Sequence, residues 1–466
     1  MNLAAELVRR TANEFDLSFS KAITMTKFPY ENRVWEEVEK LPVDQLRQLQ
    51  LERLQKTVAR VAERVPFYKE KFAAAKITPD SIKSLDDLQR LPLTTKADLR
   101  EHYPLGFLAT SRDEVLRYHG SSGTTGKPTM VAYTRNDIVT WSNMCARFLV
   151  GGGLQPHHTV QIAFGYGLFT GGFGLHYGVE RVGAAIIPAA SGNTQRQIML
   201  MQDMQSDALV CTPSYALNIA DVIKHEGIDP STLSLKFAFF GGEGWTEQMR
   251  ASIETDLGVF ASNNYGLSEV IGPGVSGECA ARDGMHFQED HFIVECLDPD
   301  TLEPVADGER GELVITAITK EAMPIIRYRT RDIATLNCEP CVCGRTGKRM
   351  SRVLGRSDDM MIIRGVNVYP SQIEEALLKI EGATPHYEIE LTRPKTLDVI
   401  TVKVEITPDQ FSDKLADMAA LKDRINVAIM QVTGVHMQLE LMPPRSLKRF
   451  EGKAARVTDL RNLKVE

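Results

Sequence analysis

The first part of the chain carries the hydrophobic pattern of α-helices. Between residues 35 and 75, leucine and valine side chains recur at steps of about three and four, which places them on one helical face. Pro66 interrupts this pattern, because a proline ring removes a backbone hydrogen bond from a helix interior. Residues 1–110 are therefore expected to form a mainly helical leading segment.

The pattern changes between residue 115 and about residue 330, where short β-prone runs alternate with helical stretches. The expected strands cover residues 160–163, 184–188, 208–211, 237–240 and 312–316. The expected helices cover residues 194–205, 214–226 and 246–257. This alternation predicts an α/β fold in which helices are layered on largely parallel strands.

A polar segment at residues 355–358 predicts a domain boundary. Residues 1–355 are expected to form a large multi-layer domain with mixed and parallel sheets. Residues 356–466 are expected to form a small, mobile α+β domain. The predicted fold class is therefore α/β with two domains of unequal size.

The small domain is expected to begin with a helix over residues 371–380, in which Ser371 is the N-cap and Glu374 its capping-box partner. Elsewhere in this domain, alternating hydrophobic and polar residues predict strands over 399–406 and 437–441. Hydrophobic residues at helical spacing predict one or two helices over 408–432.

Composition and charge exclude several classes of protein. Hydrophobic residues make up 43% of the 466 residues and charged residues 25%, which is typical of a soluble globular protein. A net charge of −7 without long runs of one sign argues against a nucleic-acid partner. The first ten residues lack the apolar core of a signal peptide, and no stretch approaches the ~18 apolar residues of a membrane span. We therefore expect a cytoplasmic protein with no membrane partner.

The seven cysteines are an odd number, which argues against a disulfide framework. Cys145 and Cys211 lie in apolar surroundings, and Cys296 lies in an expected strand. These three are expected to be buried thiols.

The remaining cysteines have the spacing of a metal site. Cys279 and His286 form one pair, and Cys341 and Cys343 flank a tight turn. Three thiolates and one imidazole make a closed tetrahedral site, so these four residues are predicted to bind a structural Zn²⁺ ion. Cys338 is then surplus, and reduced thiols without a metal are the alternative.

Residues 120–129 form a loop rich in glycine and hydroxyl side chains that includes one lysine. Glycines let backbone N–H groups turn toward an anion, hydroxyl groups donate hydrogen bonds, and Lys127 adds a positive charge. Pro128 and a β-prone run follow it, so the loop is not a Walker A motif, which opens a helix. A flexible linker is the alternative. The predicted phosphate-binding residues are Ser121, Ser122, Gly123, Thr124, Thr125, Gly126 and Lys127.

Two further segments offer contacts to a nucleotide. Gly242 and Glu243 directly follow an expected strand, where glycine lets a flat ligand approach the backbone, although an ordinary strand-to-helix turn has the same composition. The aspartate of Tyr328–Asp332 can accept two hydroxyl hydrogen bonds, which fits a ribose. An exposed salt-bridge cluster is the alternative there.

The segment Asn263–Glu269 combines several functional side chains. Tyr265 offers an aromatic face to a purine, and Asn264 can hydrogen-bond its amine. Ser268 can donate to a phosphate oxygen, and Glu269 can bind Mg²⁺, which prefers oxygen ligands. Surface turn chemistry is the alternative.

The order of these motifs resembles that of the adenylate-forming superfamily, whose members convert a carboxylate and ATP into an acyl-adenylate. The resemblance covers most of the chain, from about residue 115 to residue 456. It implies that Asp332 binds the ribose, that Arg356 contacts the nucleotide and that Asp358 is the hinge of the small domain. It also implies that Gly365 lies in the coenzyme A channel and that Lys453 is the catalytic lysine.

Within this superfamily the chain resembles the phenylacetate–CoA ligase family. The segments that carry the resemblance are residues 164–172, 212–215, 265–274, 285–292 and 365–371. The resemblance implies an aryl pocket formed by Phe164, Tyr166, Gly167, Phe169 and Gly242. The chain departs from the family at two positions. Phe164 stands where the family commonly has tyrosine, and Gly244 stands in the place of the proline that often follows the Gly-x-Glu turn.

The resemblance implies a ligase that uses ATP, Mg²⁺ and coenzyme A to activate an arylacetate, releasing AMP and diphosphate. Lys453, Glu269 and Arg356 would be its catalytic residues, with Gly266 and Ser268 at the nucleotide. The family also implies a homodimer. Two alternatives stay open: an adenylase that delivers the acyl group to a carrier protein or an amine, and a non-catalytic zinc protein that binds nucleotide. The preferred aryl acid is not fixed by the sequence.

Overall fold

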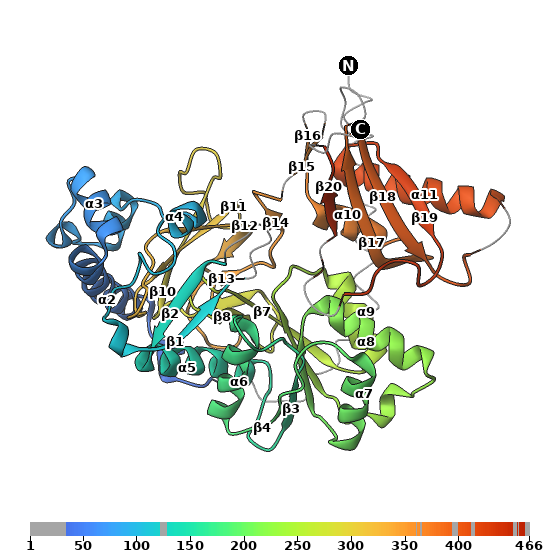
Figure 1. The fold of residues 1–466 in the computed structure, drawn as a ribbon, viewed down its shortest axis with the longest axis horizontal. Helices are drawn as coiled ribbons and strands as arrows, with labels where there is room; N and C mark the ends of the chain where they lie inside the picture. Colours follow the sequence, from blue (N-terminus) through green and yellow to red (C-terminus); the bar gives the residue numbers. More distant parts are fainter. Residues whose placement is uncertain are drawn as a thin grey trace. The chain divides into compact units, whose positions relative to one another are not determined.

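The computed structural model describes residues 34–121, 128–359, 361–363, 366–393, 399–411, 415–450, 454 and 456–461. The expected α/β fold class is confirmed: helices cover a large mixed sheet, and a smaller α+β domain follows it (Figure 1). Residues 122–127, Gly365 and Lys453 lie outside the described residues. The boundary at residue 355 stays a prediction.

The leading segment is built from helices. α2 (Val43–Arg64) ends where Val65 adopts an extended conformation, and Pro66 opens α3 (Pro66–Ala74) at its first position. The predicted interruption at Pro66 is confirmed. The shorter helices are η1 (Glu37–Lys40), η2 (Pro79–Ser81), η3 (Leu85–Arg90), α4 (Lys96–Glu101) and η4 (Arg112–Glu114).

An antiparallel hairpin flanks the predicted phosphate-binding loop. Its strands are β1 (Val115–Gly120) and β2 (Met130–Thr134). The backbone N–H of Ser121 donates to the Thr129 carbonyl at 2.9 Å, and the Ser121 hydroxyl accepts from the Thr129 N–H at 3.3 Å. These bonds close the neck of the loop between the two strands.

The large sheet has a parallel half in the spatial order β4-β3-β5-β6-β7. Its strands are β3 (Thr159–Ile162), β4 (Ala185–Ile187), β5 (Ala208–Cys211), β6 (Phe237–Gly241) and β7 (Phe260–Leu267). The first four of these strands and their parallel direction were predicted, and this prediction is confirmed. β7 was missed.

The other half of the sheet is antiparallel, in the order β7-β8-β9-β13-β12-β11-β10. Its strands are β8 (Gly272–Glu278), β9 (Met285–Phe287), β10 (Phe292–Leu297), β11 (Arg310–Ala317), β12 (Tyr328–Asn337), β13 (Arg349–Met350) and β14 (Gly355–Arg356), which pairs with β12. The sequence indicated only β10 and β11. The expectation of largely parallel strands thus holds for one half of the sheet.

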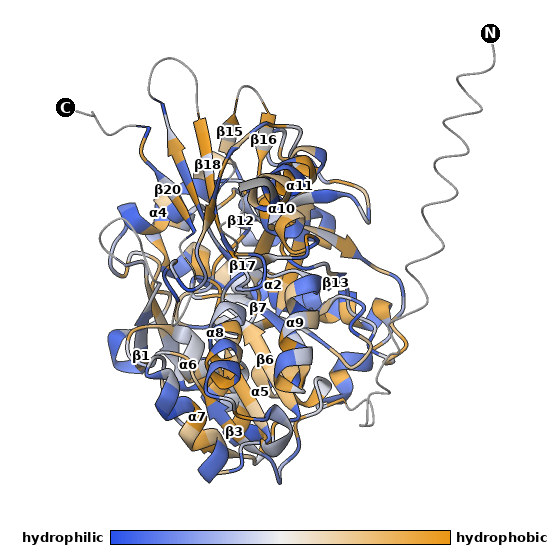
Figure 2. Ribbon diagram, turned by 90° about the vertical axis from the view of Figure 1, so that its right-hand side faces the viewer, coloured by the Kyte–Doolittle hydropathy of each residue, from blue (hydrophilic) through white to orange (hydrophobic). Residues whose placement is uncertain are grey.

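Helices lie on both faces of the parallel half. The bounds are α5 (Arg135–Gly151), α6 (Thr170–Val182), α7 (Thr194–Asp203), α8 (Pro213–His225) and α9 (Glu247–Leu257). The strand order reverses direction after β4, and right-handed crossovers then place α6 on one face and α7, α8 and α9 on the other. Figure 2 shows β6 largely in hydrophobic colour, whereas the more exposed α7 carries both colours.

Glycines let α5 pack directly against its neighbours. A Cβ atom at Gly174 of α6 would lie 2.3 Å from Trp141, and one at Gly277 of β8 would lie 2.3 Å from Phe148. No side chain fits in such a space, so α5 contacts bare backbone on both sides. Trp141 also donates its indole N–H to the Pro273 carbonyl at 2.8 Å.

The small domain has its own sheet and core. The sheet order is β19-β18-β17-β20, and α10 and α11 pack on it to enclose a hydrophobic core around Val402 and Ile425. Its elements are β15 (Met361–Ile363), β16 (Val366–Val368), α10 (Pro370–Leu377), β17 (Ala383–Thr392), β18 (Val399–Ile406), α11 (Leu415–Thr433), β19 (Gln438–Met442) and β20 (Val457–Asp459).

The predicted cap of α10 is wrong. Pro370 takes the first helical position, which makes Tyr369 the N-cap, and the Tyr369 N–H donates to Gln372 Oε1 at 2.9 Å. Ser371 instead donates its hydroxyl to the Leu354 carbonyl. Glu374 is buried and accepts a hydrogen bond from the Tyr387 hydroxyl at 2.9 Å. A proline at the first position thus displaced the cap by two residues.

Burial of three thiols is confirmed, with exposed fractions of 0% for Cys145 and Cys211 and 8% for Cys296. Burial raises the pKa of Cys145 above its usual value. Among the described residues, none of the helices has both the length and the apolar character that a bilayer crossing requires.

We expect Glu278→Gln to destabilise the large domain by about 3 kcal/mol, because the buried Arg250 guanidinium loses its buried anionic partner and keeps only the exposed Glu247. Arg250 of α9 donates to both carboxylate oxygens of Glu278, at 2.8 and 2.7 Å, and both side chains are buried. Thermal unfolding followed by circular dichroism measures the effect.

The matched control is Glu247→Gln, which removes the exposed partner of the same Arg250. It should cost less than about 1 kcal/mol. Equal melting temperatures for the two variants would contradict the importance of the buried pair.

Candidate active site and metal centre

The carboxyl end of β6 brings a glycine turn to the edge of the parallel sheet. Gly242 has a φ of 84°, a conformation that residues with a Cβ rarely adopt. A Cβ atom there would lie 3.7 Å from the Phe164 ring and 3.8 Å from the Thr212 methyl group. The structure therefore brings together Phe164 and Gly242, two of the predicted aryl-pocket residues.

The other aryl-pocket residues lie along the segment that leads into α6. The Tyr166 hydroxyl lies 3.2 Å from His176 Nδ1, and its ring packs edge-on against Phe173 at 5.2 Å. Gly167 is exposed and has a φ of 95°, and Phe169, directly before α6, is 46% exposed. Tyr166 thus has partners on α6, while Phe169 is open to solvent.

Asp332 links three elements of the sheet. The Tyr265 hydroxyl of β7 donates to Asp332 Oδ2 at 2.8 Å, and Arg356 of β14 donates to Asp332 Oδ1 at 2.9 Å. Burial and the neighbouring Asp332 raise the pKa of Tyr265 well above its usual value, so the hydroxyl stays protonated and donates. Arg356 also donates to Asp358 at 2.9 Å. Four predicted site residues therefore form one hydrogen-bonded group.

Glu269 and Ser268 lie directly after β7, beside the start of α6. The Ser268 hydroxyl lies 2.8 Å from that of Thr170, and Glu269 is 7% exposed. Lys96, the first residue of α4, places its Nζ 3.2 Å from Glu269 Oε1. Lys96 is not among the site residues that the sequence predicted. Its only local signal is the helix cap at Thr95, because the partner carboxylate comes from a distant segment.

A second lysine lies close to the same carboxylate. Lys320 is 3% exposed, donates to the Val270 carbonyl at 3.0 Å and lies 4.7 Å from the centre of the Tyr133 ring. Burial lowers the pKa of Lys320 to about 8, against the attraction of Asp137 and Glu269. Glu269 therefore pairs with one exposed amine, while a buried amine contacts the next residue in the chain, Val270.

Asn264 and Gly266 shape the turn between β7 and β8. Asn264 Oδ1 accepts the Gly274 N–H at 2.8 Å, so the predicted bond to an adenine amine would need the second lone pair of this oxygen. A Cβ atom at Gly266 would lie 2.0 Å from the Gly272 carbonyl oxygen. Only glycine fits at this position.

Glu243 connects the large domain to the end of the chain. Its Oε1 accepts the Ser214 N–H at 2.7 Å, in the first turn of α8, and its Oε2 accepts the Ala454 N–H at 2.9 Å. Both carboxylate oxygens thus have backbone partners. Ala454 directly follows Lys453, so the residue next to the predicted catalytic lysine lies at the edge of the sheet.

The four predicted metal ligands lie together. Cys279 follows β8, His286 belongs to β9, and Cys341 and Cys343 lie in the turn between β12 and β13. All four are buried, and their ligand atoms lie within 4.8 Å of one another. Cys338 is exposed and lies outside this cluster.

The separations within the cluster fit a tetrahedral zinc ion. Zn–S bonds of about 2.3 Å and a Zn–N bond of about 2.0 Å require S···S separations of about 3.8 Å and S···N separations of about 3.5 Å. Cys279 Sγ lies 3.8 Å from Cys341 Sγ, and Cys343 Sγ lies 3.4 Å from His286 Nε2. Four protein ligands leave no open position, which is typical of a structural site.

The turn that carries two of these cysteines also binds η1 and Leu41, the residue after η1. Arg345 donates to Glu39 at 2.6 Å and its backbone N–H lies 3.5 Å from Cys343 Sγ. Thr346 donates its N–H to the Glu39 carbonyl at 3.2 Å and its hydroxyl to the Leu41 carbonyl at 2.6 Å. The cluster therefore anchors the beginning of the leading segment.

Most of the chain is similar to known families. Residues 39–319 match the family of AMP-binding enzymes, and residues 365–461 match the C-terminal domain of AMP-binding enzymes. A phenylacetate–coenzyme A ligase of Thermus thermophilus is 48% identical over 439 residues, which cover 91% of this chain and 99% of that protein.

The fold is also similar to solved structures. A crystal structure of 2-hydroxyisobutyryl-CoA ligase in the postadenylation state, in complex with R3-HIB-AMP, matches with a TM-score of 0.86 at 30% identity over 91% of each chain. The same ligase in the thioesterification state, in complex with 2-HIB-AMP and CoA, matches with a TM-score of 0.67 at 31% identity over 91% of this chain and 92% of that one. The fold described here is therefore closer to the postadenylation arrangement.

Proposed function

The chain belongs to the phenylacetate–coenzyme A ligase family of AMP-binding enzymes, and we propose that it joins phenylacetate or a close aryl acid to coenzyme A. The reaction is ATP + arylacetate + CoA → arylacetyl-CoA + AMP + diphosphate. The observation that carries this proposal is the 48% identity to a phenylacetate–coenzyme A ligase across both domains. The grouping of Tyr265, Asp332 and Arg356 supports it independently of that comparison.

The nucleotide is proposed to bind along the edge of the sheet. Residues 121–127 bind the β- and γ-phosphates, and Ser268 donates to a phosphate oxygen. Asp332, which the Tyr265 hydroxyl and the Arg356 guanidinium orient, is proposed to accept the ribose hydroxyls, because a carboxylate can accept hydrogen bonds from two hydroxyls at once. The Tyr265 ring and the bare backbone of Gly242 then flank the adenine.

Glu269 is proposed to bind Mg²⁺, which would offset phosphate charge when bound. Its present partner Lys96 is a cation, so the carboxylate already faces positive charge in this site. A metal ion bound to Glu269 would release Lys96 toward the phosphates.

The first half-reaction is attack of the acid's carboxylate on the α-phosphorus, with diphosphate as the leaving group. Two anions meet in this step, so the ammonium of Lys453 and the guanidinium of Arg356 are proposed to stabilise the transition state. The small domain then rotates about Asp358, removes Lys453 and opens the channel at Gly365 to the thiol.

The aryl group is proposed to lie between Phe164 and Gly242. The space above Gly242 is bounded by the Phe164 ring and the Thr212 methyl group, both of which are apolar. Such walls accept a flat ring and contribute by burial of its surface.

Cys279, His286, Cys341 and Cys343 are proposed to bind a structural Zn²⁺ ion, which the separations of their ligand atoms support. We also propose a homodimer located in the cytoplasm. A reducing compartment suits seven free thiols, of which Cys338 is exposed.

We expect Lys453→Ala to lower the rate of adenylation by about 100-fold or more, because the meeting anions lose their cation. Thioester formation from synthetic phenylacetyl-adenylate should stay close to the wild-type rate. Exchange of labelled diphosphate into ATP measures the first step, and release of thioester measures the second. Lys422→Ala, an exposed lysine of α11, is the control. Equal loss of both steps would contradict the assigned role.

A panel of acids with free coenzyme A tests the reaction itself. Phenylacetate should exceed benzoate and 3-phenylpropionate in kcat/KM by about tenfold or more, because each differs by one methylene in an apolar pocket. Adenylate formation without thioester would favour a carrier-protein or amine acceptor. Absence of diphosphate exchange with every acid would favour a non-catalytic nucleotide-binding protein.

Metal analysis of the purified protein should find one equivalent of zinc. Cys343→Ser should lose the metal and lower the melting temperature by roughly 5 °C or more, since about 1 kcal/mol corresponds to about 2–4 °C in a domain of this size. Cys338→Ser, the matched control, should keep both. Wild-type protein without metal would refute the zinc site.

A further inference from the structure

We propose that Glu243 and Asp221 of the large domain are positioning residues for the adenylation step. They contact the segment here called the strap, whose described residues are 447–450, 454 and 456. Lys453 lies within the strap by sequence. This inference rests on the proposed function, in which Lys453 acts only in the first half-reaction.

Glu243 holds the strap on the carboxyl side of Lys453. The Ala454 N–H donates to Glu243 Oε2 at 2.9 Å, and the other oxygen of the same carboxylate accepts the Ser214 N–H at 2.7 Å. The positive end of the α8 dipole favours the carboxylate at this place. One charged side chain therefore joins α8 to the residue that follows Lys453.

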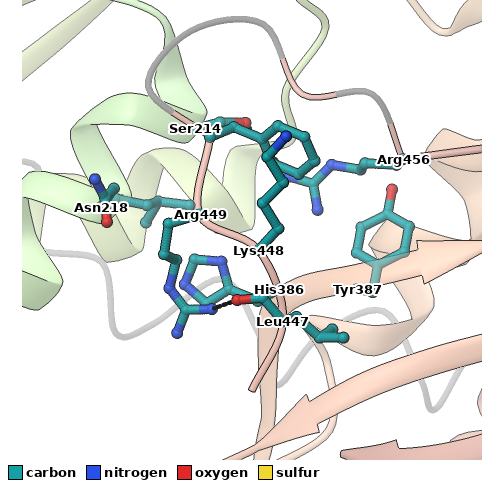
Figure 3. Close-up of a pocket in the computed structure, with 10 residues that line it drawn as sticks. Ser214, Asn218, His386, Tyr387, Leu447, Lys448, Arg449 and Arg456 are labelled. Atoms are coloured by element: carbon teal, nitrogen blue, oxygen red, sulfur yellow. Dashed lines mark hydrogen bonds between the residues drawn. The ribbon is translucent and has the colours of Figure 1, made fainter. Parts of the chain in front are cut away.

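Arg456 reinforces this contact from the small domain. It donates to the Ser214 hydroxyl at 3.4 Å and to the Pro385 carbonyl at 2.7 Å, and its guanidinium lies 4.3 Å from the centre of the Tyr387 ring. Figure 3 shows Arg456 and Tyr387 close together. The carboxyl-side end of the strap is thus fixed to both domains.

Asp221 contacts the small domain on the amino side of Lys453, both at the strap and next to it. Its Oδ2 lies 3.7 Å from Arg449 Nε of the strap and 2.9 Å from His386 Nε2 of β17, and its backbone carbonyl accepts from Arg445 at 3.3 Å. Arg449 in turn donates to both oxygens of Glu405, at 2.8 and 2.6 Å. Although burial acts in the opposite direction, the hydrogen bond with His386 and the charges of Arg449 and Arg445 lower the pKa of Asp221 below its usual value.

The contacts on both sides belong to one arrangement of the two domains. Ser214 and Asn218 of α8 face Leu447, Lys448 and Arg449 across a small pocket (Figure 3). Rotation of the small domain away from α8 breaks the bonds of Glu243 and Asp221 to the strap. Interactions present in one state alone shift the equilibrium toward that state. The match to the postadenylation structure, at a TM-score of 0.86 against 0.67, is consistent with this assignment.

The test measures both half-reactions in Glu243→Gln and Asp221→Asn. Each change keeps the size of the side chain and removes its charge. We expect diphosphate exchange to slow by about tenfold in each variant, since Glu243 loses a charge-assisted bond to the strap and Asp221 loses its charged contacts with Arg449 and His386 of the small domain. Thioester formation from synthetic phenylacetyl-adenylate should stay at the wild-type rate or rise.

Asp207→Asn is the matched control. Asp207 forms an ion pair with Lys236 at 2.7 Å within the large domain and does not contact the strap. It should leave the ratio of the two half-reaction rates unchanged. A purely structural role of Glu243 and Asp221 would lower both half-reactions equally and would overturn the proposal.

The outcomes separate this inference from the proposed function. Wild-type diphosphate exchange that depends on Lys453, together with wild-type exchange in Glu243→Gln and Asp221→Asn, would overturn the inference alone. Wild-type protein without exchange for any aryl acid would overturn the proposed function.

Discussion

The candidate active site is built on the edge of the sheet where the parallel strands β6 and β7 end. β6 and β7 finish side by side, so Gly242 and Tyr265 are delivered to the same place by the sheet itself. Asp332 then ties this edge to the antiparallel half through one bond from Tyr265 and one from Arg356.

Two further carboxylates at this edge, Glu269 and Glu243, have different kinds of partner. Glu269 collects positive charge from Lys96 and lies near Lys320, whereas Glu243 collects backbone N–H groups from α8 and from the strap. The first is suited to a metal ion and phosphates, and the second to holding a protein segment. In this proposal Glu269 takes part in the reaction, and a separate carboxylate, Glu243, holds the small domain in position.

The sequence predicted those parts whose signal is local. Four parallel strands followed from β-prone runs. The grouping of the four proposed zinc ligands followed from residue type and spacing, although Cys279 and Cys341 are 62 positions apart, and metal binding itself stays a prediction. β8 was missed because its glycines are poor strand formers, and it is stabilised by the close packing of α5 on its backbone. Lys96 and the strap contacts of Glu243 were missed because their partners come from distant segments. Roles assigned to residues 122–127, Gly365 and Lys453 stay predictions.

The turn at Arg345 and Thr346 fastens two stretches of chain that are 306 positions apart. Joining such remote stretches costs loop-closure entropy that no local turn has to supply. Cys341 and Cys343 of the proposed zinc site lie beside this joint, and a bound metal ion would fix the shape of the turn in advance. Glu39 and Leu41, near the start of the described residues, would thereby be held in place by a turn that lies late in the large domain.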